Sequence, residues 1–185
     1  MTISDKFRED LLAAIPGLRA FGISLTSRTD RADDLLQETL MKAWKHHDSF
    51  QPGTNMKAWL FTILRNEFYS QIRKRSREVE DAEGAFAGKV ESPPEQYGHL
   101  DLADFRSALA LLPEDQREAI ILVGASGFSY EEAADICKVA VGTIKSRVNR
   151  ARNRLSEVLQ LDGSYSTKIE DQTHIPAKRV YPAGD

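Results

Sequence analysis

Apolar residues recur at intervals of three and four along most of the chain, and no stretch alternates apolar and polar residues as a half-buried strand would. This spacing predicts an all-α protein. A first helix is expected over residues 5 to 26, with Pro16 and Gly17 breaking or kinking it. A second is expected over residues 30 to 47, and its inward-facing side chains are predicted to be Leu35, Leu36, Leu40 and Trp44.

A long helix follows the loop DSFQPGTN, and Asn55 is well placed to cap it. This helix has two apolar arcs on roughly opposite sides: one holds Met56, Trp59, Leu60 and Ile63, and the other holds Phe61, Phe68 and Ile72. This pattern is typical of the central helix of a bundle, which is apolar nearly all round. Alternatively, the helix contributes aromatic side chains to the contact with a partner. The far end is a basic cluster beside Tyr69, a mixture that suits single-stranded or melted nucleic acid: Arg65, Arg73, Lys74, Arg75 and Arg77.

Two small helical domains are expected, joined by a flexible linker. Residues 78 to 97 combine acidic residues, glycine, alanine and a Pro-Pro pair with too few large apolar residues for a core. We therefore expect a first module at 5–77, a linker at 78–99 and a second module at 100–160. The segment 161–185 is polar and lacks periodicity, which predicts a disordered tail.

The second module contains the pattern of a helix-turn-helix. Helical spacing resumes at Leu100, stops before Pro113 and continues with that proline at the next helix start. Ser129 and Glu132 form a capping box that opens the short helix YEEAADIC. A turn and a longer basic helix follow, as in DNA-binding helix-turn-helix proteins.

The basic helix VGTIKSRVNRARNRL, residues 141 to 155, contains five lysines and arginines and no acidic residue. Its core face is predicted to consist of Val141, Ile144, Val148, Ala151, Leu155 and Val158. The opposite face presents Ser146, Asn149 and Asn153, flanked by Lys145 and Arg150, with Thr143 near the helix start. Amide and basic side chains can meet base edges and phosphates. A solvated face is the alternative, but such faces usually intersperse glutamate with lysine, so the pattern favours DNA binding.

Composition narrows the possible functions. The 185 residues carry a net charge of -3, so nucleic-acid binding must depend on local patches. The single cysteine excludes a disulfide within the chain, and neither a membrane span nor a secretory signal is evident, which predicts a cytoplasmic protein. No catalytic, metal-binding or cofactor motif is present, and we expect no enzyme activity, metal or cofactor. The acidic edge Asp33, Asp34, Gln37 and Glu38 would repel DNA and is either solvated or meets a basic protein.

The motifs DDLLQETLMKAW, MKAWLFTILRN, LPEDQREAIIL, SYEEAADIC and VGTIKSRVNRARNRL occur in the order and spacing of the extracytoplasmic-function sigma factors of bacterial RNA polymerase. The resemblance covers about residues 5 to 160. The wording VGASGFSYEEAA further resembles the general-stress-response EcfG subgroup.

This resemblance implies a promoter-specificity subunit that also assists melting of the -10 element. The implied polymerase-docking residues, on the β′ clamp helices, are Asp34, Gln37 and Glu38. The implied -10 residues are Thr54, Asn55, Met56, Lys57, Arg65, Asn66, Tyr69 and Arg73. The implied -35 residues are Thr143, Lys145, Ser146, Asn149 and Arg150. The first part of the second module would contact the β flap, and an anti-sigma protein would sequester both modules.

Two other functions compete with this one. A sigma-like decoy would titrate an anti-sigma protein without binding DNA, but it has no need for the basic cluster or the acid-free helix. A plain helix-turn-helix repressor or activator leaves the acidic edge and the two-sided aromatic helix unexplained.

Overall fold

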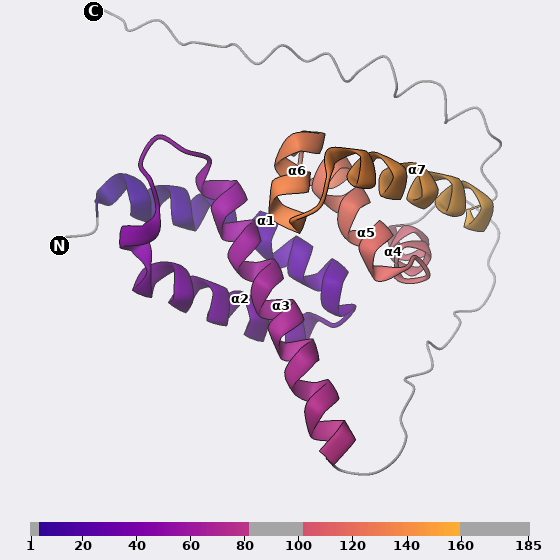
Figure 1. The fold of residues 1–185 in the computed structure, drawn as a ribbon, viewed down its shortest axis with the longest axis horizontal. Helices are drawn as coiled ribbons and strands as arrows, with labels where there is room; N and C mark the ends of the chain where they lie inside the picture. Colours follow the sequence, from indigo (N-terminus) through magenta and orange to yellow (C-terminus); the bar gives the residue numbers. More distant parts are fainter. Residues whose placement is uncertain (1–3, 82–101, 160–185) are drawn as a thin grey trace, which may run out of the picture.

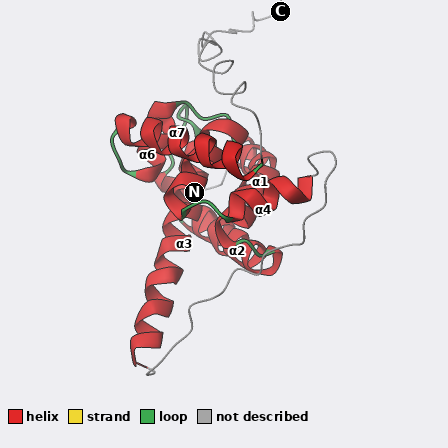
Figure 2. Ribbon diagram, turned by 90° about the vertical axis from the view of Figure 1, so that its right-hand side faces the viewer, coloured by secondary structure: helices red, strands yellow, loops and turns green. Residues whose placement is uncertain are grey.

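The computed structural model describes residues 4–81 and 102–159, and in these ranges it contains helices and turns without a strand (Figure 2). The first module consists of α1 (Asp5–Thr26), α2 (Thr29–Lys45), the short 3-10 turn η1 (His47–Ser49) and α3 (Met56–Asp81). The second consists of α4 (Leu102–Ala110), α5 (Glu114–Ile120), the π-helical turn η2 (Ile121–Ala125), α6 (Tyr130–Cys137) and α7 (Val141–Val158). The all-α prediction is confirmed. The expected linker begins inside α3, and its remainder, like the expected tail, lies outside the described residues.

Helix α1 runs through Pro16 without interruption, so of the predicted break or kink the break is wrong. A proline removes one backbone hydrogen bond, but packing on both sides of it holds the helix together. Phe7 and Leu11 precede the proline, Leu18 and Phe21 follow it, and all four are buried. The burial of these four side chains stabilises the helix by more than Pro16 destabilises it.

Helix α2 buries Leu35 and Leu36 as predicted and half-buries Leu40, but Trp44 is 46% exposed, which corrects the prediction. The small side chain of Ala43, fully buried, occupies the inward position instead. A helix packed closely on its neighbours accepts alanine where an indole would not fit. Trp44 therefore lies on the outer surface.

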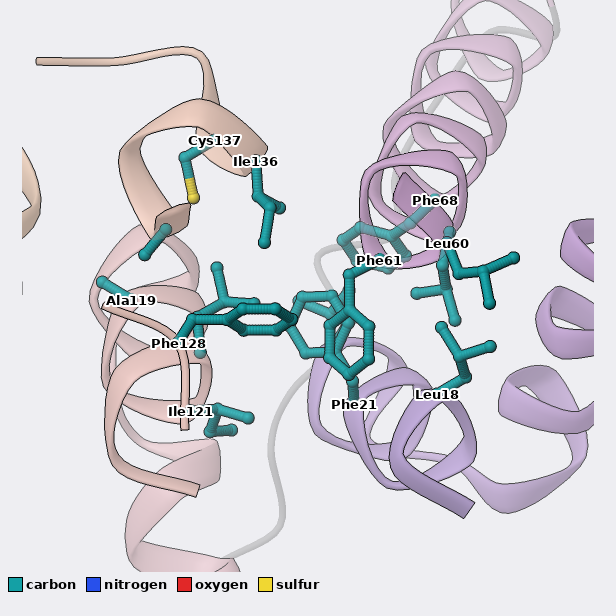
Figure 3. Close-up of a cluster of buried hydrophobic side chains, with 14 of the residues drawn as sticks. Leu18, Phe21, Leu60, Phe61, Phe68, Ala119, Ile121, Phe128, Ile136 and Cys137 are labelled. Atoms are coloured by element: carbon teal, nitrogen blue, oxygen red, sulfur yellow. The ribbon is translucent and has the colours of Figure 1, made fainter. Parts of the chain in front are cut away.

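Helix α3 contacts α1 and α2 of its own module and α6 of the second, and its C-terminal half projects beyond the other helices (Figure 1). Of its second apolar arc, Phe61 faces the second module, whereas Ile72 is 38% exposed. Phe61 stacks on Phe21 at a centroid distance of 5.0 Å and meets the edge of Phe128 at 4.9 Å. Figure 3 shows Phe128 reaching toward Phe61 beside Ile136. The two modules thus share one hydrophobic core, and the partner that the second arc needed is the second half of the chain.

The helix start and the buried face predicted from the local sequence of the second module can be compared with the structure. The capping box is present, because the Ser129 hydroxyl accepts from the Glu132 amide at 3.1 Å and the Glu132 carboxylate accepts from the Ser129 amide at 2.9 Å. Helix α7 buries Ile144, Val148, Ala151 and Leu155. Val141 is half-buried, whereas Val158 is 40% exposed, so its assignment to the core face is wrong. It is the last residue of α7, and the next residue, Leu159, packs on the core in its place.

Of the helices that the structure describes, none has the length and apolar character needed to cross a membrane.

Candidate nucleic-acid interface

The loop before α3 is held by its own polar side chains. The Thr54 hydroxyl donates to the Gln51 carbonyl at 2.7 Å, and Gly53 supplies a left-handed turn with φ of 88°. The Asn55 side-chain oxygen accepts from the Ala58 amide at 3.1 Å, which confirms the predicted helix cap. These hydrogen bonds therefore hold the loop in one conformation at the start of α3.

A groove of about 1060 Å³ lies between this loop and α1. Four predicted -10 residues line it, and the opposite wall carries aromatic side chains from the start of α1 and from the segment after α2. Its size reaches that of sites that enclose small ligands. The groove can accept a flat ring with polar groups at its mouth. The residues meant are Thr54, Asn55, Met56 and Lys57, facing Phe7, His47 and Phe50.

A second, smaller groove of about 440 Å³ separates α2 from α3. The predicted residues Asn66 and Arg73 line this groove rather than the first one. Lys42 of α2 and His46, the residue that follows this helix, face them, and Lys42 is ion-paired with Glu67 of α3. Neither Lys42 nor His46 was among the predicted site residues. Because Lys42 and His46 are four residues apart, the sequence already predicted that both lie on the same side of the helix.

The remaining two predicted -10 residues, Arg65 and Tyr69, point at the second module. The Arg65 Nε donates to the Glu118 Oε1 at 2.6 Å, and the Tyr69 hydroxyl lies 3.4 Å from the Glu118 Oε2. The Arg65 guanidinium also stacks over the Tyr69 ring at 4.6 Å. Burial opposes the charge of Arg65, but the Glu118 carboxylate outweighs this effect and raises the pKa of the guanidinium. Burial, reinforced by Glu118, raises the pKa of the Tyr69 hydroxyl, so the ring stays neutral.

The outward face of α7 agrees with the helical pattern. Lys145, Asn149 and Arg150 are exposed, whereas Thr143 and Ser146 are half-buried. The Ser146 hydroxyl donates to the Thr143 carbonyl at 2.9 Å, which ties down the start of this face. These five residues lie together along the first three turns of one helix.

One basic residue of α7 has a structural partner. The Arg147 Nε lies 3.1 Å from the Asp115 Oδ2 of α5, and this pair joins two helices of the same module. The pairing was hidden from the sequence because the acid lies in another helix. Fewer cations therefore face outward than the sequence suggests.

The acidic edge of α2 carries Asp34 and Gln37 exposed and Glu38 half-buried. The same helix exposes two large apolar side chains, Met41 at 53% and Trp44 at 46%. Such mixed polar and apolar surfaces are typical of protein interfaces. Met41 follows Gln37 by one helical turn, so the sequence spacing held this signal as well.

Among the described residues, no group of three or more histidine, cysteine, aspartate or glutamate side chains is arranged to hold a metal ion. Cys137 is buried against the shared core, and burial raises the pKa of its thiol to about 12.

Comparison with known families matches both modules. Residues 13–78 match Sigma-70 region 2, and residues 102–155 match Sigma-70, region 4. The chain is 63% identical over 164 residues to the ECF RNA polymerase sigma factor EcfG of Rhodopseudomonas palustris, which covers 89% of this chain and 91% of that protein. It is 35% identical over 139 residues to the ECF RNA polymerase sigma factor SigM of Bacillus subtilis, covering 73% and 83% respectively.

The fold resembles that of the sigma factor RpoE from Bartonella quintana, solved in complex with the anti-sigma factor NepR. The TM-score is 0.76 at 64% identity, and the match covers 86% of this chain and 99% of that one.

Proposed function

The chain belongs to the extracytoplasmic-function sigma factors and directs core RNA polymerase to promoters, and from this premise we propose which of its surfaces serves each step. The first module, residues 5–77, acts as the domain that docks on the polymerase clamp and binds the -10 element. The second, residues 100–160, binds the -35 element, and residues 78–99 link the two.

The observation that carries this proposal is the division of α7 into two faces. Ile144, Val148 and Ala151 are buried, so the opposite face is fixed outward, and between residues 141 and 155 that face lacks acidic side chains. In a major groove, Asn149 can pair with adenine and Arg150 with guanine. Lys145 contacts the phosphates beside these bases. Thr143 and Ser146 contact the DNA near the start of the helix.

The -10 element is bound as it opens. A base that leaves the stack enters the groove beside the loop, where its pairing edge meets Thr54, Asn55 and Lys57, with Met56 as an apolar contact. The strand continues along α3 past Asn66 and Arg73, with Arg65 and Tyr69 as further contacts for phosphate and base. The size of the groove and the exposure of Asn66 and Arg73 support this assignment.

The polymerase is bound at the acidic edge of α2. Asp34, Gln37 and Glu38 dock on the β′ clamp helices, and the exposed Met41 and Trp44 add apolar area to the contact. The first part of the second module contacts the β flap. Each module therefore carries one polymerase surface and one DNA surface.

An anti-sigma protein controls this chain by covering both modules. The similar RpoE is held by NepR in its complex, which supports this assignment. The genes that the chain serves are proposed to form a stress regulon. The chain acts in the cytoplasm and has no catalytic activity of its own, because transcription chemistry belongs to the polymerase.

Reconstituted transcription on a library of promoter sequences tests the proposal. Core polymerase with this chain should initiate from templates that share a -35 and a -10 motif, whereas core polymerase alone should not. No stimulation by a folded chain would refute the promoter-specific role and favour the decoy.

The site assignment has its own test in the same assay. Arg73→Ala should lower initiation from linear templates more than from templates with a pre-opened -10 region. Arg154→Ala, which removes an arginine outside the proposed site, serves as the control. No loss on either template would exclude Arg73 from the -10 site.

A further inference from the structure

We propose that His46 binds a phosphate of the opened -10 strand in the smaller groove, and that it does so in its protonated form, so that binding of the strand tightens as the pH falls. The inference deepens the proposed -10 function and rests on it, because the strand is proposed to pass Asn66 and Arg73 in the same groove. His46 faces both of these residues from the end of α2.

Hydrogen bonds fix the backbone of His46 on both sides. Its amide donates to the Lys42 carbonyl at 2.9 Å, and its carbonyl accepts from the Ser49 amide at 3.0 Å and from the Ser49 hydroxyl at 2.7 Å. The residue therefore ends α2 in a defined turn, and it is exposed where it lines the groove. Because its backbone is already ordered, little further ordering is needed when the imidazole binds a ligand.

The charges around the groove favour an anion. Three of the side chains that line it are basic: Lys42, His46 and Arg73. Among the described residues that line it, the one acid is Glu67, whose side chain is 11% exposed and accepts from Lys42 and, at 3.2 Å, from the Gln71 amide. Burial opposes the charge of this carboxylate, but the hydrogen bonds from Lys42 and Gln71 outweigh it and lower the pKa of Glu67. The carboxylate thus already has its partners within the first module.

The rest of the groove suits one nucleotide of a single strand. Its apolar part comes from Trp59 and Ile63, which are half-buried, and further hydroxyl and amide groups come from Ser49, Asn66 and Ser70. Its volume of about 440 Å³ lies in the range of sites that hold one small ligand. Proteins hold single strands by placing cations along the phosphates and apolar or aromatic side chains against the bases. The groove offers both.

Histidine differs from the lysine and arginine beside it, because its charge changes near neutral pH. Neutral imidazole donates from one nitrogen, whereas imidazolium donates from both and carries the charge that attracts a phosphate. The charged or titratable neighbours of His46 are Lys42, Glu67 and Arg73 around the groove and Lys45, His47 and Asp48 along the chain. A phosphate favours the protonated form, so DNA and the proton strengthen each other's binding. The affinity for the strand therefore rises as the pH falls.

The size of the effect follows from one phosphate contact. For single strands, the logarithm of the binding constant falls with the logarithm of the salt concentration by about 0.7 for each neutralised phosphate. At 0.1 M salt this slope corresponds to about fivefold in affinity. The unaltered chain should therefore bind the opened strand about fivefold more tightly at pH 6 than at pH 8, with a salt slope that is steeper by about 0.7 at pH 6.

Holoenzyme assembled from core polymerase and the full chain tests the proposal. The probe is a fluorescent promoter template with a pre-opened -10 region, taken from the promoter library, and binding is read by anisotropy at pH 6 and pH 8. His46→Gln removes the titrating charge, and His46→Lys makes the charge permanent. Lys45→Gln is the matched control, because Lys45 is an exposed cation next to His46 that lines neither groove. Each affinity is divided by that of the unaltered chain at the same pH, so the pH dependence of the polymerase cancels.

The expected ratios differ between the variants. His46→Gln should bind about fivefold more weakly than the unaltered chain at pH 6 and equally at pH 8, whereas His46→Lys should bind equally at pH 6 and about fivefold more tightly at pH 8. Lys45→Gln should keep the same ratio at both pH values. A ratio for His46→Gln that does not change with pH would overturn the proposal. A pH dependence that survives His46→Gln and disappears in His47→Gln would overturn it as well.

The two possible failures are distinguishable. If the unaltered holoenzyme binds the opened template at neither pH, the proposed -10 function fails, and the role of His46 fails with it. If the unaltered holoenzyme binds the template and the ratio for His46→Gln stays constant, only the role of His46 fails.

Discussion

Phe128→Ala should destabilise the first module, although Phe128 belongs to the second. Its ring meets the edge of Phe61 at 4.9 Å, a contact type worth about 1 kcal/mol. The Lys57 ammonium lies 4.9 Å from the ring centre, which adds about 0.5–1 kcal/mol. The first module therefore loses about 1.5–2 kcal/mol. With a urea slope of about 1.5 kcal/mol per molar, its unfolding midpoint should fall by about 1 M.

The chain contains its own reporter for this experiment. Both tryptophans of the sequence, Trp44 and Trp59, lie in the first module, so their fluorescence follows that module alone. Circular dichroism follows the helices of both modules. The matched control is Phe105→Ala, a removal of the same size in the second module at a side chain that is 38% exposed. It should change the stability of the first module, read from the tryptophan transition, by less than about 0.5 kcal/mol.

The refuting result is specific. If Phe128→Ala shifts the circular dichroism transition while the tryptophan transition keeps its midpoint, the first module draws no stability from the second. The shared core would then be a contact without energetic weight.

The other predictions concern single sites. Asn149→Ala or Arg150→Ala should each cost about 1–3 kcal/mol of discrimination at one -35 position in promoter-library transcription, while core polymerase binding stays unchanged; a loss of core binding would contradict the assignment of the two faces. Because burial raises the pKa of Cys137 to about 12, its thiol should react with a thiol reagent at neutral pH roughly 100-fold more slowly in the folded chain than in urea. Ser129→Ala should cost about 1 kcal/mol in thermal unfolding by removing the capping box, whereas Ser129→Thr should retain most of it.

Local chemistry was predictable because it depends on neighbours in sequence. The cap at Asn55 and the capping box at Ser129 join groups three residues apart, and both are present. The outward face of α7 over residues 141 to 155 was predictable for the same reason, since the burial of Ile144 and Val148 fixes where Asn149 points. Each of these inferences needs only the geometry of one helix.

The predictions that failed needed the distance between helices. Trp44 satisfies the inward spacing of α2, but the close neighbours of that helix leave room only for Ala43. Val158 satisfies the spacing of α7, but it lies at the end of the helix, where Leu159 takes the place on the core. Pro16 should have interrupted α1, but buried residues on both sides of it keep the helix continuous. Periodicity predicts which face of a helix is buried, but it does not predict how much space the side chains of that face have.

The pairing of charged residues between helices was predicted least well from the sequence. Glu118 and Arg65 are 53 residues apart, and nothing in either helix marks the other as its partner. Arg147 is likewise held by Asp115 from a different helix. A count of lysines and arginines is therefore an upper bound on the cations that DNA can meet, because folding assigns some of them to internal carboxylates. The salt dependence of DNA binding measures the number that remain. For this chain that number should be smaller than the count of lysines and arginines in α3 and α7, since Arg65 is paired with Glu118 and Arg147 with Asp115.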